Sequence, residues 1–243
     1  MAAAQRQLES AGIECQVQEA INPGVAGDAQ VYEVACLDAP GYILVASEPP
    51  QTFNCLELAG SAYVSQIEDP EADTGQQCSL PANQNGLELI GGWAREAGVT
   101  CRLDEALAIG KTSGGETVYE VGCDGVDGYH LDKTAEGWRA QDCLLVVAGQ
   151  GVCRFTTPDE QKATVQAKLA GTEAADCAVE QFRLMGQNDN GRFFEVKCAA
   201  AGEGYVARIK DDVAQQIYSC ATAQNIGGGC TLTQTPAAAT SEQ

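Results

Sequence analysis

The chain has 243 residues, of which 44% are hydrophobic, and a formal net charge of −20. This hydrophobic content is ordinary for a globular protein and excludes a disordered chain. Acidic residues outnumber basic ones by 34 to 14, so the chain would repel phosphates. We therefore expect no nucleic-acid partner, and instead expect cations or basic proteins to be attracted. No apolar run approaches the roughly 18 to 20 residues that cross a bilayer, which predicts no membrane span.

The first residues lead directly into an amphipathic stretch, without the basic and apolar segment of a secretory signal. We expect either that a signal was removed or that the assigned start is incorrect. The 12 cysteines form none of the C-x-x-C pairs of zinc ribbons or the C-x-x-C-H run of haem attachment. Disulfides are the simplest explanation, and they predict a secreted, cell-surface or periplasmic location.

The cysteines fall into three quartets of similar spacing, which predicts three tandem copies of one unit. The second and third quartets match closely, whereas a longer interval between the last two cysteines of the first quartet indicates an insertion. The quartets are Cys15, Cys36, Cys55 and Cys78; Cys101, Cys123, Cys143 and Cys153; and Cys177, Cys198, Cys220 and Cys230.

Other residues recur in register with the cysteines. Y-E-V-A-C, Y-E-V-G-C and F-E-V-K-C end at the second cysteine of each quartet, and a Gly-Tyr pair follows each time. The expected organisation is a first unit with an acidic insertion, two further units and a tail. The corresponding residues are 1–80 with the insertion at about 58–77, 81–157, 158–233, and 234–243 for the tail.

Each unit is expected to open with a helix. Apolar residues recur at helical spacing before Gly12 and Gly98, and glycines of this kind are typical of helix C-caps. In the third unit Ala174 stands where the glycine would be, so its helix end is less defined. The apolar positions are Ala4, Leu8 and Ala11; Ile90, Trp93, Ala94 and Ala97; and Val165 and Leu169.

Three strand-like runs follow each helix, at about 177–185, 192–198 and 205–209 in the third unit. Asn190-Gly191 predicts a tight hairpin between the first two, because both residues tolerate positive φ. The predicted fold class is α+β: three tandem disulfide-stapled repeats, each with one helix packed on a three- to four-stranded antiparallel sheet.

Alternation along the second strand places the aromatic residue, the valine and the cysteine on the buried face, and the glutamate on the solvent side. Glu33, Glu120 and Glu195 share this position. A solvated strand face explains them. They are also candidate repeated contact positions for a basic partner or for another copy of the chain.

Units of about 75 residues have thin cores, which usually need staples. The interval between the third and fourth cysteines differs between units. A loop closed by a disulfide between these two cysteines could change length in this way without disturbing the rest of the unit. We therefore predict that the first cysteine pairs with the second and the third with the fourth. Four cysteines allow two other connectivities as well.

The sequence predicts no catalytic residue, metal site or cofactor. His130 is the single histidine and has no counterpart in the other units, so we expect it to be a surface residue. Without a second histidine or a free cysteine, neither a Cys–His dyad nor a zinc site can form. The chain also lacks a nucleophile elbow and a phosphate loop. Only a carboxylate-pair enzyme would remain, and we predict that the chain is not an enzyme.

The order of helix, glycine and strand, with Y-E-V in the next strand, resembles PepSY-type and beta-lactamase-inhibitor-type αβ units. Y-E-V-x-C, the Gly-Tyr pair and the late C-x-L-T at 230–233 are similar to uncharacterised secreted four-cysteine repeat proteins of proteobacteria. The resemblance covers nearly all of the chain at low specificity. It implies inhibition or protein binding, and it transfers no functional residue.

The leading hypothesis is a non-catalytic extracytoplasmic structural or protein-interaction repeat protein. Similar units in series suit multivalent binding, and complementary ends would allow head-to-tail assembly into extracellular fibres. The segment 235–240 and the short N-terminal arm are where a linking segment could lie. The alternative is a secreted or periplasmic inhibitor or binding module for an enzyme, with the acidic insertion at 66–77 as its inhibitory loop.

Overall fold

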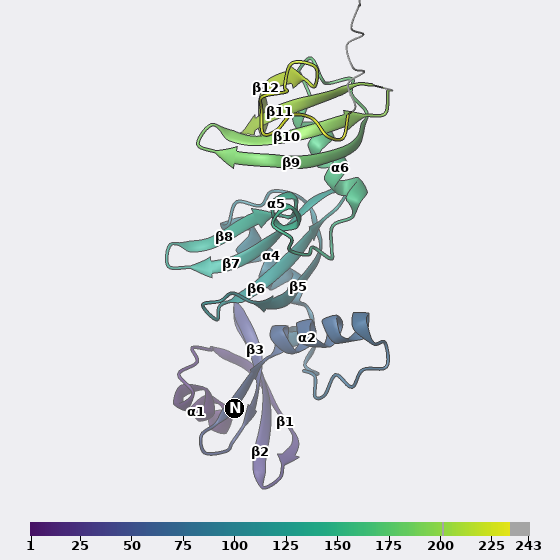
Figure 1. The fold of residues 1–243 in the computed structure, drawn as a ribbon. Coiled ribbons are helices and arrows are strands. Elements are labelled where there is room, and N and C mark those ends of the chain that lie inside the picture. The colour runs from purple at the N-terminus through teal and green to yellow at the C-terminus, as the bar shows by residue number, and fades with distance from the viewer. Residues whose placement is uncertain (201, 234–243) are drawn as a thin grey trace, which may run out of the picture. The chain divides into compact units, whose positions relative to one another are not determined.

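The computed structural model describes residues 1–200 and 202–233. The chain is α+β, with three four-stranded antiparallel sheets (Figure 1). Each sheet is a meander, in which strands that are adjacent in the sequence are neighbours in the sheet. Within the described residues, no helix is long and apolar enough to cross a membrane.

The bounds of the elements follow the three sheets in chain order. Around the first sheet they are α1 (Ala2–Ser10), β1 (Val17–Ala26), β2 (Ala29–Cys36), β3 (Ala39–Val45), β4 (Gln51–Asn54), α2 (Cys55–Glu68) and α3 (Pro81–Gln84). Around the second they are α4 (Gly86–Glu96), β5 (Leu103–Lys111), β6 (Thr117–Cys123), β7 (Val126–Thr134), β8 (Gly137–Asp142) and α5 (Cys143–Ala148). Around the third they are α6 (Pro158–Lys168), β9 (Val179–Asn188), β10 (Gly191–Cys198), β11 (Gly204–Lys210) and β12 (Val213–Ser219).

The predicted disulfide pairing is confirmed, and no cysteine is free. The first cysteine of each quartet is bonded to the second, and the third to the fourth. The pairs are Cys15–Cys36, Cys55–Cys78, Cys101–Cys123, Cys143–Cys153, Cys177–Cys198 and Cys220–Cys230.

The opening helices lie where the periodicity predicts them, and Gly12 and Gly98 have positive φ just beyond their ends. At α6, the opening helix of the third unit, Val165 and the C-cap residue Leu169 are fully buried, as expected. The glycine with positive φ is Gly171. Ala174, which stands at the expected glycine position, is instead buried in the core of the third sheet.

The hairpin predicted at Asn190-Gly191 is shifted by one residue. Asn188 pairs with Gly191, so Asp189 and Asn190 form the connection, and only the glycine has positive φ. Gly191 is also required by a close approach, because a Cβ atom there would lie 2.4 Å from the carbonyl oxygen of Ile209.

Contacts divide the chain into two compact units rather than three. One contains residues 1–124 and 129–141, and the other contains 125–128 and the described residues between 142 and 233. The boundaries predicted at 80 and 157 stay predictions, and the predicted tail at 234–243 lies outside the described residues. The helix that follows each of the first two sheets packs against the sheet that comes next in the chain.

In the first compact unit, α2 follows the first sheet and packs on β5 of the second. Leu56 joins the core of the second sheet. A Cβ atom at Gly60 would lie 1.8 Å from the carbonyl oxygen of Ala108, so the helix contacts the strand backbone directly. Glu57 fixes the contact, because it accepts the Thr117 hydroxyl at 2.6 Å.

In the second compact unit, α5 makes the corresponding contact. Leu144 is buried in the core of the third sheet together with Val165 and Phe194. Asp142 caps α5 by accepting the Leu145 N–H at 3.0 Å, and it is paired with Arg192 of β10 at 2.5 Å. Each leucine lies directly after the third cysteine of its quartet.

The glutamates of the second strands are not on the solvent side, and that prediction is wrong. Glu33 is 2% exposed, and Glu120 and Glu195 are fully buried. The strands alternate as expected, with Val34, Val121 and Val196 in the cores beneath the helices. The alternation of residues correctly separates the two faces of each strand. The glutamate face was expected to be solvated, but it is buried as well.

Candidate functional site

In the first sheet, Glu33 binds the residues that follow the fourth cysteine, Cys78. Its two carboxylate oxygens accept the Ser79 N–H at 2.8 and 2.9 Å, and Oε2 accepts the Ser79 hydroxyl at 2.7 Å. Oε1 also accepts the Leu80 N–H at 2.8 Å and the Asn83 side-chain amide at 2.9 Å. The carboxylate therefore holds this segment against the face of the sheet opposite α1.

Glu195 does the same in the third sheet, where the segment follows Cys230. Its Oε1 accepts the N–H groups of Thr231 at 2.7 Å, Leu232 at 2.6 Å and Thr233 at 3.2 Å. Its Oε2 accepts Nε of Arg183 at 2.6 Å. We call this arrangement, Glu33 with residues 79–83 or Glu195 with residues 231–233, the glutamate clasp.

The clasp explains how a carboxylate stays buried in these two sheets. Burial alone would raise the pKa of Glu33, but hydrogen bonds from Ser79, Leu80 and Asn83 outweigh it and lower the pKa below its usual range. The pKa of Glu195 is lowered in the same way, by Thr231, Arg183, Leu232 and Thr233 against the effect of burial. Both groups are anions whose bonding is satisfied inside the chain.

The clasp also explains the glycine of the Gly-Tyr pair. A Cβ atom at Gly41 would lie 2.0 Å from Oδ1 of Asn83, and one at Gly204 would lie 2.0 Å from Oγ1 of Thr233. In the second pair, the N–H of Gly128 donates to Oγ1 of Thr156, again shortly after a fourth cysteine. The glycine leaves room for the segment that crosses the strand.

The second sheet differs by placing a histidine near its glutamate. Nε2 of His130 lies 3.5 Å from Oε2 of Glu120, and the histidine side chain is 18% exposed. The expectation of an ordinary surface histidine is therefore wrong. Tyrosine precedes His130, Ile43 and Val206 alike, so the first and third units have an aliphatic residue where the second has histidine.

Carboxylate and sulfur atoms come together in the clasps without forming a metal site in the oxidised chain. Glu33 lies with Cys55 and Cys78, and Glu195 with Cys220 and Cys230, all within 4.8 Å. The sulfurs are bonded to each other, and metals bind the thiolate form of cysteine. These groups hold the structure together.

Asp127 is a buried titratable residue that the sequence analysis missed. It immediately precedes the second Gly-Tyr pair and is 3% exposed. Its Oδ2 accepts the Leu144 N–H at 2.9 Å, and Gln161 approaches Oδ1 at 3.4 Å. Burial, assisted by the nearby charge of Asp142, raises the pKa of Asp127 to about 6. The carboxyl group connects β7, α5 and α6.

We predict that Asp127→Asn stabilises the protein near neutral pH. The folded pKa of about 6 lies above the ordinary value of 3.8, so the contribution of Asp127 is complete below pH 3.8 and is lost as the pH rises through 6. The loss is on the order of 2 to 3 kcal/mol, and asparagine keeps the acceptor for Leu144 without a charge. In urea, the variant should unfold at a higher denaturant concentration than wild type at pH 7.5, and at the same concentration near pH 4. An advantage of the same size at both pH values would contradict the buried titration.

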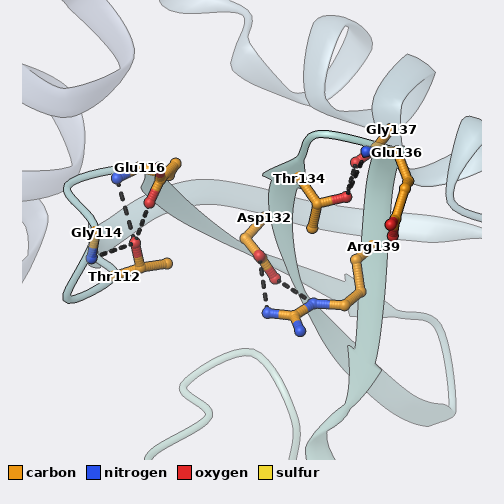
Figure 2. Close-up of polar contacts among 8 residues, drawn as sticks. All are labelled: Thr112, Gly114, Glu116, Asp132, Thr134, Glu136, Gly137 and Arg139. Carbon is orange, nitrogen blue, oxygen red and sulfur yellow. Dashed lines mark hydrogen bonds and ion pairs between the residues drawn. The ribbon is translucent and has the colours of Figure 1, made fainter.

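The hairpin tips of the second sheet carry polar residues that bind one another (Figure 2). Oγ1 of Thr112 accepts the N–H groups of Gly114 and Glu116, each at 3.2 Å. Between neighbouring strands, Arg139 donates to both oxygens of Asp132 at 3.0 and 2.9 Å. The glycine-rich stretch at 114–115 is therefore a turn.

The acidic insertion comprises the end of α2 and the loop that follows it. Tyr63 and Ile67, one helical turn apart, are 36% and 56% exposed. Glu68, at the end of α2, and Asp69, Glu71 and Asp73 of the loop are also exposed. The insertion therefore exposes both apolar and acidic side chains, and α5, the helix after the third cysteine of the second quartet, is too short to repeat it.

The chain matches no family model, no curated protein and no solved structure. The resemblance to PepSY-type and beta-lactamase-inhibitor-type units, and to secreted four-cysteine repeat proteins, stays a prediction.

Proposed function

We propose that the chain is a non-catalytic extracytoplasmic repeat protein whose surface binds partner proteins. The observation that carries the proposal is that the repeated cysteines and two of the three repeated glutamates hold the chain itself together. All 12 cysteines form disulfides, and the carboxylates of Glu33 and Glu195 are satisfied by backbone N–H groups. What remains for recognition is an acidic, disulfide-stapled surface.

A tandem repeat accounts for the three sheets. Each has the same strand order, two disulfides at equivalent places and a preceding helix. Six disulfides suit an oxidising compartment, and we propose that the chain is secreted, periplasmic or on the cell surface. Linked units of similar shape would allow one chain to contact a partner at several points.

Partner binding is better supported than a head-to-tail fibre. Leu56 and Leu144 follow the third cysteines of the first two quartets, and each is buried in the sheet that comes next. After Cys220 the corresponding residue is Ala221, which is exposed, and the segment to Cys230 consists of turns. This segment lacks the leucine that would join the third sheet to a further one.

The insertion is where we place partner recognition. It exposes apolar side chains at Tyr63 and Ile67, and four carboxylates follow them within six residues of Ile67. Such a surface complements a partner that presents basic groups around an apolar residue. The same surface would be the contact of an inhibitor, so the alternative of a secreted or periplasmic enzyme inhibitor uses it as well.

Neutralising the insertion should weaken partner binding at least about tenfold, because each charge pair at an interface changes affinity and association rate. The variant combines Glu68→Gln, Asp69→Asn, Glu71→Gln and Asp73→Asn. Asparagine preserves the side-chain acceptors at 69 and 73, which take the N–H groups of Glu71 and Gly75. Non-reduced wild-type chain on a support would first capture partners from the extracytoplasmic fraction, and biolayer interferometry would then compare affinities.

The matched control removes the same charge elsewhere in the first compact unit. Glu9→Gln, Glu14→Gln, Glu19→Gln and Asp28→Asn alter four exposed carboxylates, and this variant should bind like wild type. Equal weakening by both variants would show that net charge alone attracts the partner. Equal affinity of all three proteins would remove the insertion from the interface.

A further inference from the structure

We propose that a groove in the first compact unit binds an extended segment of a partner protein that carries an apolar side chain between basic residues. The groove lies between the β2–β3 turn and the helices α3 and α4, and has a volume of about 600 Å³. This is within the usual range for ligand pockets. The inference rests on the proposed function and names the chemistry of one partner.

Three of the residues that line the groove have large apolar side chains, Leu37, Leu89 and Trp93. Leu89 and Trp93 of α4 are half-buried there, and Leu37 of the β2–β3 turn is exposed at the opposite wall. Gly92 lies between the two helix residues, and no atom lies within 4 Å of the place where its Cβ would be. The missing side chain leaves space for an apolar side chain of a partner.

The walls are held in place by interactions outside the groove. The Trp93 ring stacks on Trp138 with centroids 4.5 Å apart, and contacts Tyr119 at 5.0 Å. On the other wall, Cys36 is bonded to Cys15, and the N–H of Leu37 donates to the carbonyl of Gln16 at 2.9 Å. A site that is already ordered loses little conformational entropy on binding.

The charges of the rim select the partner. Asp38, Glu88 and Glu96 line the groove, against a single basic side chain, Arg95. The chain as a whole carries −20, so its long-range field favours a basic segment. A lysine or arginine of the partner would pair with these carboxylates.

The test uses the fact that the chain has two tryptophans. Of Trp93 and Trp138, which stack on each other, only Trp93 lines the groove, so a change in the tryptophan fluorescence of the wild-type protein reports on the groove. The probe is a capped pentapeptide of alternating lysine and leucine, titrated into non-reduced protein. We expect a saturable change that weakens as salt is added, and at least about tenfold weaker binding for peptides with glutamate in place of lysine or serine in place of leucine.

Two variants locate the site. Gly92→Leu should fill the groove and weaken binding at least about tenfold, while circular dichroism shows an unchanged fold. The pair Glu88→Gln and Glu96→Gln should weaken binding about fivefold and reduce its salt dependence. Glu68→Gln with Glu71→Gln, which makes the same charge change in the insertion, should leave peptide binding unaltered.

Several results would contradict the proposal that the groove binds such a segment. These are no saturable change, equal binding of the three peptides, or wild-type affinity in a folded Gly92→Leu variant. Loss of peptide binding in the insertion variant would do the same. If the protein captured partners through the insertion but did not bind the peptide, the proposed function would stand and the inference about the groove would be wrong.

Discussion

Glu195→Gln is expected to lower the free energy of unfolding by about 3 to 5 kcal/mol, the usual cost of breaking a buried charge pair. Oε1 accepts three backbone N–H groups, and Oε2 accepts Arg183. Glutamine removes the charge and keeps only one acceptor oxygen, so its NH2 group must face either Arg183 or the N–H groups at 231–233. Arg183 keeps its second bond, to the carbonyl of Gly229 at 2.8 Å, which leaves the guanidinium partly satisfied.

Urea unfolding of non-reduced protein at pH 6 would measure this effect. Glu203→Gln is the matched control, because Glu203 lies in the same compact unit, is exposed and has the same charge. Its cost should stay within about 0.5 kcal/mol, as for most surface substitutions. If both variants unfolded at the same urea concentration, Glu195 would not hold the segment that follows Cys230.

The pH dependence gives a second measure of the clasp. The folded pKa values of Glu33 and Glu195 are below 4.5, so their contribution is present above pH 4.5 and is lost as the pH falls through the folded value. Glu195→Gln should therefore reduce the acid-induced loss of stability. Asp127 acts in the opposite direction, between about pH 3.8 and 6, so the two effects occupy different parts of the curve.

Gly204→Ala is the second large effect, and we expect it to cost about 2 to 3 kcal/mol, near the upper end for overpacking. The new Cβ would lie 2.0 Å from Oγ1 and 2.8 Å from Cβ of Thr233. One of the two chain segments must move, and the movement pulls residues 231–233 away from Glu195. Gly41→Ala should behave alike in the first sheet, where the obstacles are Asn83 and the carbonyl oxygen of Val34.

The control for this substitution is Gly92→Ala. Its Cβ would meet no atom within 4 Å, and the residue lies inside α4. Alanine in a helix interior is favoured over glycine by roughly 0.5 to 1 kcal/mol, so this variant should be slightly more stable than wild type. Thermal unfolding of the three variants gives the order, and a Gly204→Ala protein as stable as Gly92→Ala would show that no segment crosses the strand at that glycine.

Much of the local structure could be predicted from the sequence. The quartets led to the disulfide pairing, because the intervals between cysteines changed only where a closed loop could change length. The apolar spacing around Leu8, Ile90 and Val165 located the three opening helices. The hairpin at 188–191 was placed one residue off, because Gly191 is required by the neighbouring strand β11 as well as by its own turn.

Contacts between distant segments could not be predicted. The alternation of β2 and β10 correctly separated glutamate from valine, but the segments that cover the glutamates lie 46 and 36 residues further along the chain. The packing of α2 and α5 on the following sheets is likewise non-local. Asp127 gave no signal, because its burial depends on α5 and α6 and not on its own strand.

As to function, the sequence argued mainly against particular catalytic and metal-binding motifs. The repeated glutamates were the best candidates for a contact surface, and two of them proved to hold the chain together. The insertion was recognised from its length and charge, and the structure adds the exposed Tyr63 and Ile67. The groove beside Trp93 could not be found from the sequence, because its walls come from α3, α4 and the β2–β3 turn.

The central claim, that the chain binds partners and does not build a fibre, is tested most directly by the mass of the non-reduced protein in solution. Light scattering after size exclusion should give about 25.4 kDa at every concentration, because the segment between Cys220 and Cys230 lacks the leucine that joins one sheet to the next. A mass that rises with concentration, or filaments in negative-stain electron microscopy, would contradict the account.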